Sequence, residues 1–372
     1  MITIKEVNSA SMLKKFIKFP TWLYKNNAFY VHPLESDEKM LFSKRNPSLE
    51  NVTFKCFLAY KEKQIVGRIA VIIHDLYNEK TGKKYARFSR FDFIDDYEVS
   101  KQLIQTAMDW AKEQGMQYFH GPLGFSDFDK QGLLVEGFDR ISTFETIYNY
   151  AYYLTHLQKL GFEKEFDWLE FEIKNTGTLE QFQKVSDRMM ERSGLTILPQ
   201  SVSIKQIIEK HGEDIFNLVN DCYSHLSGYV YVTPKVQQAI LKQFQKAMKR
   251  EYTALIFEGD KLVGITLAVA SIARSVNKSQ GRLFPFGFIR IMRELKRPKY
   301  IDFCNITVSK EHRNLGLNVV LLNEVMKRAV ENGIISAETN LELEENGEVL
   351  AQNKNFSREQ IKRRRCLVKL VT

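Results

Sequence analysis

The two halves of this chain contain matching segments in the same order. One pair, "YKEKQIVGRIAV" from Tyr60 and "FEGDKLVGITLAV" from Phe257, shows a strand, a polar turn and a second strand that opens with Val-Gly. This is the pattern of a β-hairpin. The other pair, "WAKEQGM" from Trp110 and "RAVENGI" from Arg328, shows an amphipathic helix that ends at a glycine before a strand. We infer an internal duplication, in which each half is a mixed α/β unit.

The second half is longer between its hairpin and its helix, and the added residues fall on 275–298. Hydrophobic periodicity predicts the other elements. Strands are expected near 2–7, 54–61, 64–77, 85–94, 117–121, 164–173, 195–199, 253–258, 262–273, 300–308, 334–340 and 364–371. Helices are expected near 9–25, 97–114, 146–160, 204–225, 234–249, 315–332 and 343–354, with a linking helix within 174–194.

The composition is that of a globular protein with room for two cores. The 372 residues are 44% apolar and 27% charged, and a chain of this length typically forms two domains. The four cysteines lie far apart and show no zinc spacing, so we expect free buried thiols, a reducing compartment and no metal site. The opening "MITIKEV" lacks the apolar region of a signal peptide, and no apolar stretch is long enough to span a bilayer. These features predict a cytoplasmic protein.

The net charge of +9 favours an anionic partner. Nucleic acid, anionic membranes and phosphorylated cofactors all attract basic proteins. The densest basic clusters are "KRRR" (362–365) and the stretch 290–299. A dispersed basic surface that serves only solubility is the alternative. The aromatic-flanked "RFSRFDF" fits a buried strand better than nucleic-acid stacking, so no nucleic-acid partner is expected.

The segment "VSKEHRNLGLNVVLLNEVMKRAVENG", from Val308, reads as a strand end, a basic loop and an amphipathic helix. The first amides of a helix are unpaired and carry partial positive charge, so a loop that turns its amides inward there binds phosphate oxygens. Gly316 permits a positive φ or a close backbone approach, and Lys310, His312 and Arg313 add positive charge. The loop is therefore a candidate anion site.

This segment resembles the GNAT family, the acyl-CoA-dependent N-acyltransferases, whose signature R/Q-x-x-G-x-G/A precedes a helix. Arg313, Gly316 and Asn318 occupy the marked positions, and Asn318 departs from the usual glycine or alanine. The resemblance implies that acetyl-CoA or a longer acyl-CoA binds here. The implied cofactor-binding residues are Ile306, Val308, Arg313, Asn314, Leu315, Gly316, Leu317, Asn318 and Asn346. Position 353 is asparagine, where family members often carry a tyrosine that protonates the leaving thiolate.

The first half also resembles a GNAT domain, through "YNYAYYLTHLQKLGFEKEFDW" from Tyr148. The resemblance implies an α/β fold with two tandem GNAT-like domains, each a central mixed, mostly antiparallel sheet flanked by helices. We expect a degenerate first domain at 1–174 and a second domain with the cofactor loop at 175–372. The first-half loop at the corresponding place, "FIDDYEVS", contains three acids that would repel a pyrophosphate. An ordinary helix N-cap at Asp95 or Asp96 is the structural interpretation of that loop.

The resemblance implies that an amine attacks the thioester directly, with the carbonyl oxygen held by backbone N–H groups near 306–308. Asp302 and Glu338 are the candidate general bases, and ordinary strand-end residues are the alternative for both. Strand alternation places Asp302 on one face with Cys304 and Ile306, and Phe303, Asn305 and Thr307 on the other.

Three further residues are candidates for the acceptor site. Tyr231 is a candidate for the missing acid, Tyr229 and Asp92 are candidates for substrate binding, and aromatic packing is the alternative for the tyrosines.

Segment 281–299 is basic and apolar with helical spacing. It is read as a lid over an acyl chain, as an interfacial membrane helix that makes weak membrane contact, or as a helix that closes the core. The motifs of serine hydrolases, dinucleotide-binding proteins and P-loop NTPases are absent from the sequence. We therefore expect an acyl-CoA-dependent N-acyltransferase acting on an amine, with a non-catalytic ligand- or lipid-binding protein on a GNAT scaffold as the alternative.

Overall fold

The computed structural model describes residues 1–174, 179–346 and 358–371. The first half runs β1 (Ile2–Glu6), α1 (Ala10–Leu23), α2 (Glu35–Leu41), η1 (Pro47–Leu49), β2 (Val52–Lys61), β3 (Gln64–His74), α3 (Asp75–Thr81), β4 (Tyr85–Phe93), α4 (Tyr97–Glu113), β5 (Tyr118–Gly121), β6 (Leu133–Glu136), α5 (Tyr152–Lys159) and β7 (Glu163–Lys174).

The second half begins with the linking helix α6 (Leu179–Ser193). It continues through β8 (Thr196–Ile197), α7 (Ile204–Tyr223), α8 (Pro234–Phe244), β9 (Met248–Glu258), β10 (Lys261–Ala270), α9 (Ala273–Lys278), α10 (Gly287–Lys296), β11 (Tyr300–Val308), η2 (Lys310–Leu315), α11 (Leu317–Glu331), β12 (Ser336–Glu338), β13 (Glu342–Leu343) and β14 (Arg358–Leu370). The added residues of this half form α9 and α10.

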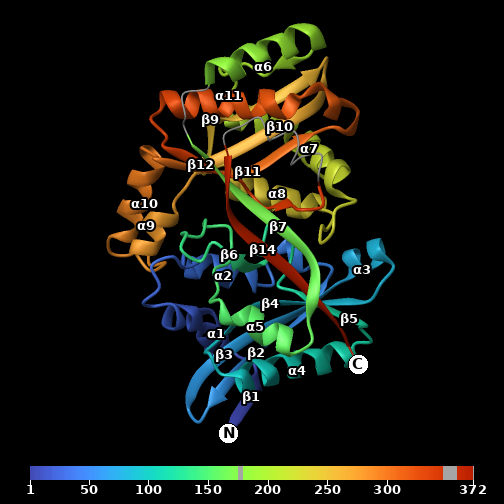
Figure 1. The fold of residues 1–372 in the computed structure, drawn as a ribbon, viewed down its shortest axis with the longest axis vertical. Coiled ribbons are helices and arrows are strands. Elements are labelled where there is room, and N and C mark those ends of the chain that lie inside the picture. Colours follow the sequence, from blue (N-terminus) through green and yellow to red (C-terminus); the bar gives the residue numbers. More distant parts are fainter. Residues whose placement is uncertain (175–178, 347–357, 372) are drawn as a thin grey trace.

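Both halves follow the same strand plan, which confirms the predicted duplication. A hairpin opens each plan, β2–β3 in the first half and β9–β10 in the second, and a third antiparallel strand follows. The third strand then pairs in parallel with the strand after the helix, β4 with β5 and β11 with β12. The mixed, mostly antiparallel sheet flanked by helices is also confirmed (Figure 1).

The last strand of the chain joins the two halves. β14 lies between β5 and β7 and is antiparallel to both, while β7 also pairs with β12 of the second half. In Figure 1, β14 and β7 run side by side from one half into the other. A division of the chain at 174/175 therefore puts β14 in the second half by sequence and in the first half by pairing. That division stays a proposal.

The basic cluster "KRRR" lies on β14 and is not a surface for polyanions. The side chains of Lys362 and Arg364 are fully buried, and they pair with Glu338 and Glu170. Arg363 and Arg365 both pair with Asp167. In the register with β7, Lys362 faces Glu170 and Arg365 faces Asp167, while Arg363 and Arg364 reach these same two acids from neighbouring positions. Because a buried charge is costly unless it is paired, these pairs bind β14 into its place in the sheet.

Each half packs its principal helix on the sheet. The predicted apolar face of α11 is buried, with Val319, Leu322, Met326 and Ala329 in one cluster with Ile301 and Phe303 of β11. Burying one such large side chain contributes about 1.5–3 kcal/mol relative to exposure. Strand β11 is thus held from behind by α11, which positions the site on its other face.

Two predicted helices differ from the structure. The helix expected near 146–160 begins only at Tyr152, because Asn149 bonds both the N–H and the carbonyl of Leu134 (2.7 and 3.1 Å) and holds its segment extended. A helix is expected from the sequence near 343–354. In the structure, Leu343 belongs to β13 and residues 344–345 form a turn. Residues 347–357, including Asn353, lie outside the described part of the chain.

Candidate active site

Strands β11 and β12 pair only at their first residues and then diverge. Their parallel ladder has three pairs and ends where Asp302 faces Glu338. Beyond it, the side chain of Asn340 reaches across to the carbonyl of Cys304 (2.9 Å). On the opposite edge, β10 pairs Leu267 with Asn305 and Ala268 with Phe303, so that Cys304 is an extra residue, a β-bulge.

The bulge overturns the predicted alternation of β11. An extra residue moves every later side chain to the opposite face of the sheet. Phe303 packs against α11 before the bulge, and Ile306 packs against the same cluster after it. Ile306 therefore does not share a face with Asp302. Asp302 instead shares its face with Asn305 and Thr307.

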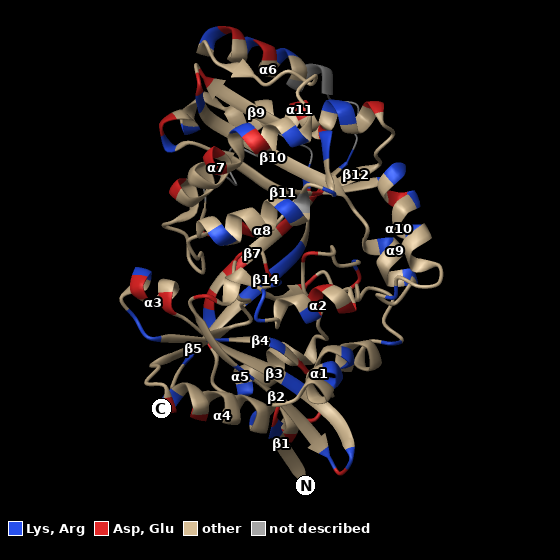
Figure 2. Ribbon diagram, turned by 180° about the vertical axis from the view of Figure 1, so that it is seen from behind, with Lys and Arg blue, Asp and Glu red and all other residues tan. Residues whose placement is uncertain are grey.

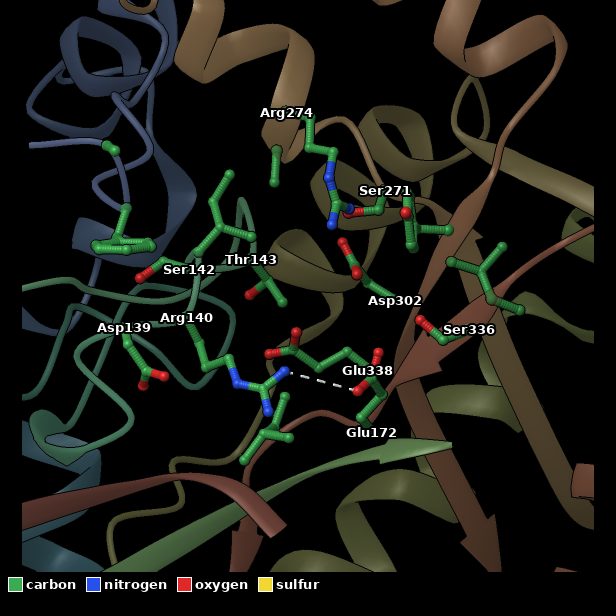
Figure 3. A pocket seen from close by; sticks show the side chains of 17 residues that line it. Asp139, Arg140, Ser142, Thr143, Glu172, Ser271, Arg274, Asp302, Ser336 and Glu338 are labelled. Atoms are coloured by element: carbon green, nitrogen blue, oxygen red, sulfur yellow. Dashed lines mark ion pairs between the residues drawn. The ribbon is translucent and has the colours of Figure 1, made fainter. Parts of the chain in front are cut away.

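A pocket of about 320 Å³ opens beside the last pair of this ladder, between the two halves (Figure 3). The first half contributes Ala28, Phe29, Asp139, Arg140, Ile141, Ser142 and Thr143. The second half contributes Ser271, Ala273, Arg274, Tyr300, Ile301, Asp302, Ser336 and Glu338, and the joining strands add Glu172 and Ile361. Asp302 and Glu338, chosen from the sequence as candidate bases, thus line one pocket.

Both carboxyl groups hold their protons more tightly than usual. Burial raises the pKa of Asp302 to about 7, against the opposing effects of the Ser271 hydroxyl and Lys362. Burial also raises the pKa of Glu338 to about 8, and the charges of Glu170 and Asp302 add to the rise while bonded Lys362 opposes it. A base with a pKa near the working pH is suited to accept a proton from a substrate.

The pocket combines four acids with two guanidinium groups. Arg140 lies 3.8 Å from Glu172, and the guanidinium of Arg274 stacks 3.6 Å from the ring of Tyr300. Figure 3 shows Asp302, Glu338 and Glu172 gathered around the pocket with these two arginines. Once Asp302 and Glu338 ionise, the pocket carries more carboxylate than guanidinium groups, which favours a cationic ligand such as a protonated amine.

The basic loop leads into α11 with the predicted backbone. Gly316 has φ 69° and precedes the helix without a side-chain cap. The hydroxyl of Ser309 and Nδ1 of His312 lie 2.7 Å apart and brace the turn. The open side of Gly316 is covered by the linking helix, because a Cβ built there would lie 2.7 Å from Cε of Met189. The helix therefore begins as expected for the predicted anion site, with Met189 beside Gly316, and the phosphate role stays a prediction.

The backbone of β11 also fits the predicted carbonyl site. The carbonyl of Ile306 accepts from the Tyr223 hydroxyl (3.1 Å), and that of Val308 accepts from the Cys222 thiol (3.3 Å). The N–H of Ser309 donates to the carbonyl of Val263 on β10 (2.8 Å). Because adjacent strand residues alternate between the two edges, the carbonyls of Val308 and Ile306 point away from β10. Since the N–H and C=O of a strand residue point to the same side, the amides of Ile306 and Val308 also point away from β10, toward the diverging edge.

Tyr223 is the residue that the sequence analysis missed. Its hydroxyl contacts Asn305 (3.3 Å) and Thr307 (3.0 Å) as well as Ile306. Burial raises its pKa to about 12. The only sequence signal was its place near the end of the helix expected at 204–225, which does not separate it from neighbouring aromatic residues.

The other predicted residues lie apart from the pocket. Tyr229 is buried with its hydroxyl bonded to Asn220 (2.8 Å), and Tyr231 is 52% exposed. Asp92 is paired with Arg68 (2.7 Å) inside the first half. Asn346 follows the turn after β13, with its N–H bonded to the carbonyl of Leu343 (3.0 Å).

The remaining loop residues lie at the end of η2 and in the first turn of α11. Asn314 and Leu315 are exposed, Arg313 and Asn318 are half-buried, and Leu317 is buried in the core.

The corresponding loop of the first half is a helix cap. The side chain of Asp96 accepts from the N–H of Glu98 (3.1 Å) and pairs with Lys61 (3.1 Å). Asp95 lies 3.1 Å from Nε2 of His156. The N-cap interpretation is confirmed, and the acids place negative charge where the second half has Gly316.

One group of potential metal ligands stands out among the described residues. Ligand atoms of His120, Glu165 and Cys366 lie within 4.8 Å of one another. Nδ1 of His120 and Glu165 are 2.9 Å apart, and the Cys366 thiol lies 3.4 Å from the same carboxylate. Hydrogen bonds thus link the three side chains, while Nε2 of His120 is buried without a hydrogen-bond partner. The four cysteines form no disulfide.

Comparisons of the sequence with known proteins gave two curated relatives. No protein-family model matches the chain. Protein YghO of Escherichia coli is 26% identical over 284 residues, which covers 76% of this chain and 72% of the relative. The bacterial ceramide synthase of Caulobacter vibrioides is 23% identical over 301 residues, covering 79% and 77%.

Comparison with solved structures identifies the fold. A tandem GNAT protein from the clavulanic acid biosynthesis pathway aligns with a TM-score of 0.59 at 11% identity, covering 100% of this chain and 99% of the other. A GCN5-related N-acetyltransferase from Anabaena variabilis aligns with a TM-score of 0.53 at 12% identity, covering 100% and 73%. The chain therefore has the tandem GNAT fold. Among the described helices, none combines the length and apolar character needed to cross a membrane.

Proposed function

We propose that the protein is an acyl-CoA-dependent N-acyltransferase whose acceptor amine binds in the pocket between the halves. The observation that carries the proposal is the pair Asp302 and Glu338, two buried carboxyl groups with pKa values near neutrality. They line the pocket at the point where β11 and β12 separate. The GNAT fold and the acidic pocket support the same reaction class.

The residues divide the chemistry as follows. The carboxylates of Asp302 and Glu338 attract a protonated amine, and one of them removes a proton so that the nitrogen can attack the thioester carbon. A C–N bond then forms and the C–S bond breaks, and the second proton lost by the nitrogen is passed on to the leaving thiolate. The amides of Ile306 and Val308 receive the carbonyl oxygen. Tyr223 places a hydroxyl beside Ile306. The ring of Tyr229 packs 5.8 Å from that of Tyr223, but its hydroxyl bonds to Asn220, and Tyr231 is exposed.

The cofactor loop would hold the pyrophosphate of acyl-CoA through the amides at the start of α11. Gly316 has φ 69° and the helix has no side-chain cap, so these amides have no competing carboxylate of the kind found in the first half. Lys310 and Arg313 add cations at the same end.

The name of one relative is consistent with this reaction class. A ceramide is an N-acylated amino alcohol, so a bacterial ceramide synthase is named for a product with an amide bond. We extend only the amide-forming class to this chain, because the identity of 23% does not carry a substrate. The acceptor is proposed by its chemistry, a cationic amine.

A second candidate function is a non-catalytic protein that binds its ligand on the GNAT scaffold. Two observations favour it: Asn318 stands where glycine or alanine is usual, and Met189 covers the open side of Gly316. Binding of CoA without turnover over a panel of amines would support this candidate against the enzyme.

Calorimetry with acetyl-CoA and with longer acyl-CoAs tests the cofactor directly. We expect saturable binding to at least one of them. The absence of binding to all of them by the folded protein would reject both the enzyme and the placement of the loop.

Charge reversal at Arg313 tests the loop itself. Arg313→Glu should weaken acyl-CoA binding by at least about tenfold, because a carboxylate would replace a cation near the pyrophosphate. The matched control is Glu98→Lys, a reversal in the equivalent loop of the first half, which should leave the affinity unchanged. Equal affinity of Arg313→Glu and wild type would contradict the assignment.

A further inference from the structure

Five large apolar side chains lie exposed together at the start of α10. Phe284 is 82% exposed, Phe286 64%, Phe288 53%, Ile289 61% and Met292 47%. We call them the α10 face. Single exposed apolar residues are common, but a contiguous group of this kind marks an interaction site.

The helix is anchored to the protein by its opposite side. Gly287 and Ile291 are buried, and Ile291 packs with Ala273 and Val276 of α9. With 3.6 residues per turn, Phe288, Met292 and Ile289 fall within an arc of about 100° on the outer side. One side of segment 281–299 therefore closes the core, in agreement with one interpretation of the sequence. Its other side leaves an apolar stripe exposed.

Basic side chains surround this stripe. Residues 271–299 contain eight Lys or Arg and one acid, Glu294. Glu294 turns inward and accepts from the N–H of Ser275 (3.0 Å). Arg290, Arg293 and Lys296 are exposed on α10 itself. Figure 2 shows α9 and α10 at the edge of the molecule, with Lys and Arg along them.

We propose that the α10 face docks onto an anionic lipid bilayer. An amphipathic helix with aromatic and aliphatic residues on one side and cations beside them lies in the interfacial plane, where apolar side chains enter the acyl boundary and cations meet lipid phosphates. The long stems of Arg290, Arg293 and Lys296 allow their charged ends to reach the headgroups while the helix lies flat.

Charge also decides against a second copy of the chain as the occupant. A two-fold contact places the same surface of each subunit against itself. On the α10 face this would bring Arg293 and Lys296 toward their own counterparts. An anionic surface removes that repulsion.

The α10 face adjoins the pocket between the halves. Ser271, Ala273 and Arg274, at the start of α9, line the pocket. Asn277 on α9 donates to the carbonyls of Ala28 (3.1 Å) and Tyr30 (2.7 Å) in the first half. If the proposed N-acyltransferase function holds, docking would place the acceptor pocket beside the bilayer, from which an amphiphilic amine can enter.

Vesicle flotation measures membrane binding in the absence of acyl-CoA and of any reaction. A negative result would therefore reject the docking proposal without bearing on the proposed N-acyltransferase function. The full chain is mixed with vesicles of phosphatidylcholine alone or with phosphatidylglycerol added, at low and high salt. We expect binding to the anionic vesicles, weakened by salt. The variant Phe284→Ser/Phe288→Ser/Ile289→Ser should bind about tenfold or more weakly, because three inserting side chains are lost.

Two further variants separate the apolar from the electrostatic contribution. Arg290→Gln/Arg293→Gln/Lys296→Gln should lose the preference for anionic vesicles and the salt dependence. Trp22→Ser/Leu370→Ser removes exposed apolar residues elsewhere and should bind as wild type. Absence of wild-type binding to anionic vesicles would overturn the proposal. So would a dimer in light scattering that the Phe284→Ser/Phe288→Ser/Ile289→Ser variant dissociates.

Discussion

The two halves place opposite chemistry at the same point of the same ladder. In the first half, the third and last parallel pair before the strands diverge is Arg87 with His120. In the second half, it is Asp302 with Glu338. Arg87 is buried and bonded to two carbonyls, and burial lowers the pKa of His120, which is bonded to Glu165. The side chains of Arg87 and His120 are therefore bonded to other protein groups, whereas those of Asp302 and Glu338 line a pocket.

The loops after these strands differ in the same sense. The first-half loop satisfies its helix with Asp96, and the second-half loop enters its helix through Gly316 without a cap. A duplicated backbone thus retains the strand divergence and the helix end in both halves. In the first half the side chains of the ladder pair and of the loop bond to other protein groups. In the second half the ladder pair lines the pocket and the helix begins without a side-chain cap.

The largest expected effect is the loss of the base. Asp302→Asn should lower kcat by about 10²–10⁴-fold if Asp302 takes the proton. Because the base must be deprotonated, wild-type kcat/KM should rise with pH through about 7, and this limb should change in the variant. Since Asp302 and Glu338 interact, the limb belongs to the pair. Rate measurements from pH 5 to 9 provide the check.

The first half supplies the control for this variant. His120→Gln removes the residue at the equivalent ladder position and should leave the pH profile in place. If both Asp302→Asn and Glu338→Gln retain the wild-type rate, neither carboxyl group is the base, and the proposed difference between the halves is wrong.

The next effect concerns folding stability: the same Asp302→Asn change that lowers activity should make the protein more stable. Asp302 has a pKa of about 7 in the fold against a reference of 3.8. The unfolded chain therefore ionises first, and stability falls as pH rises from about 4 to about 7. Asparagine cannot ionise, so Asp302→Asn should be about 2–4 kcal/mol more stable than wild type at pH 8. The gain should vanish near pH 4.

Denaturant unfolding at pH 4, 6 and 8 measures this difference. Glu98→Gln, at an exposed residue of the first-half loop, serves as the matched control and should show no such trend. If the stability gained by Asp302→Asn does not increase with pH, burial does not oppose the ionisation of Asp302 in the wild-type protein.

A smaller effect is expected at Tyr223. Tyr223→Phe removes the hydroxyl that contacts Ile306 and Thr307 and should lower kcat by about 10–100-fold with little change in acyl-CoA affinity. Tyr231→Phe, at an exposed tyrosine outside the pocket, should have no effect. A larger loss in Tyr231→Phe would restore the assignment made from sequence.

The smallest effects compare the two helix ends. Gly316→Ala should cost about 1–3 kcal/mol, because alanine is strained at φ 69° and its Cβ meets Met189. Asp96→Ala should cost about 1 kcal/mol through the lost cap. Only the first change should also weaken acyl-CoA binding. The double variant Gly316→Ala/Met189→Ala removes the contact with Met189 and leaves only the backbone strain. Thermal unfolding measures the stability of each variant, and calorimetry measures its acyl-CoA affinity.

Local pattern was enough for much of the fold. The repeated hairpins, the helix that ends at Gly333 and the loop at Gly316 are all encoded within a few residues of each other, so periodicity and glycine placement predict them. Asp302 and Glu338 could also be selected from the sequence, because each is the single acid of its strand. Their meeting in one pocket could not be predicted in this way.

Three features were beyond local pattern because partners distant in sequence decide them. The bulge at Cys304 is visible only in the pairing with β10, and it reverses the face of Ile306. The "KRRR" run resembles an exposed basic patch until β7 places acids against it. Tyr223 gains its role from Ile306, which is 83 residues away.

By itself, the sequence determined a duplicated α/β chain, a helix end suited to an anion and two acids on neighbouring strands, since each of these depends on short-range spacing. Only the tertiary structure decided which acids meet, because the pocket is formed by residues from both halves and closed by the last strand of the chain. Burial within that assembly, which no local pattern contains, raises the pKa values of Asp302 and Glu338 into the range where they can act as bases.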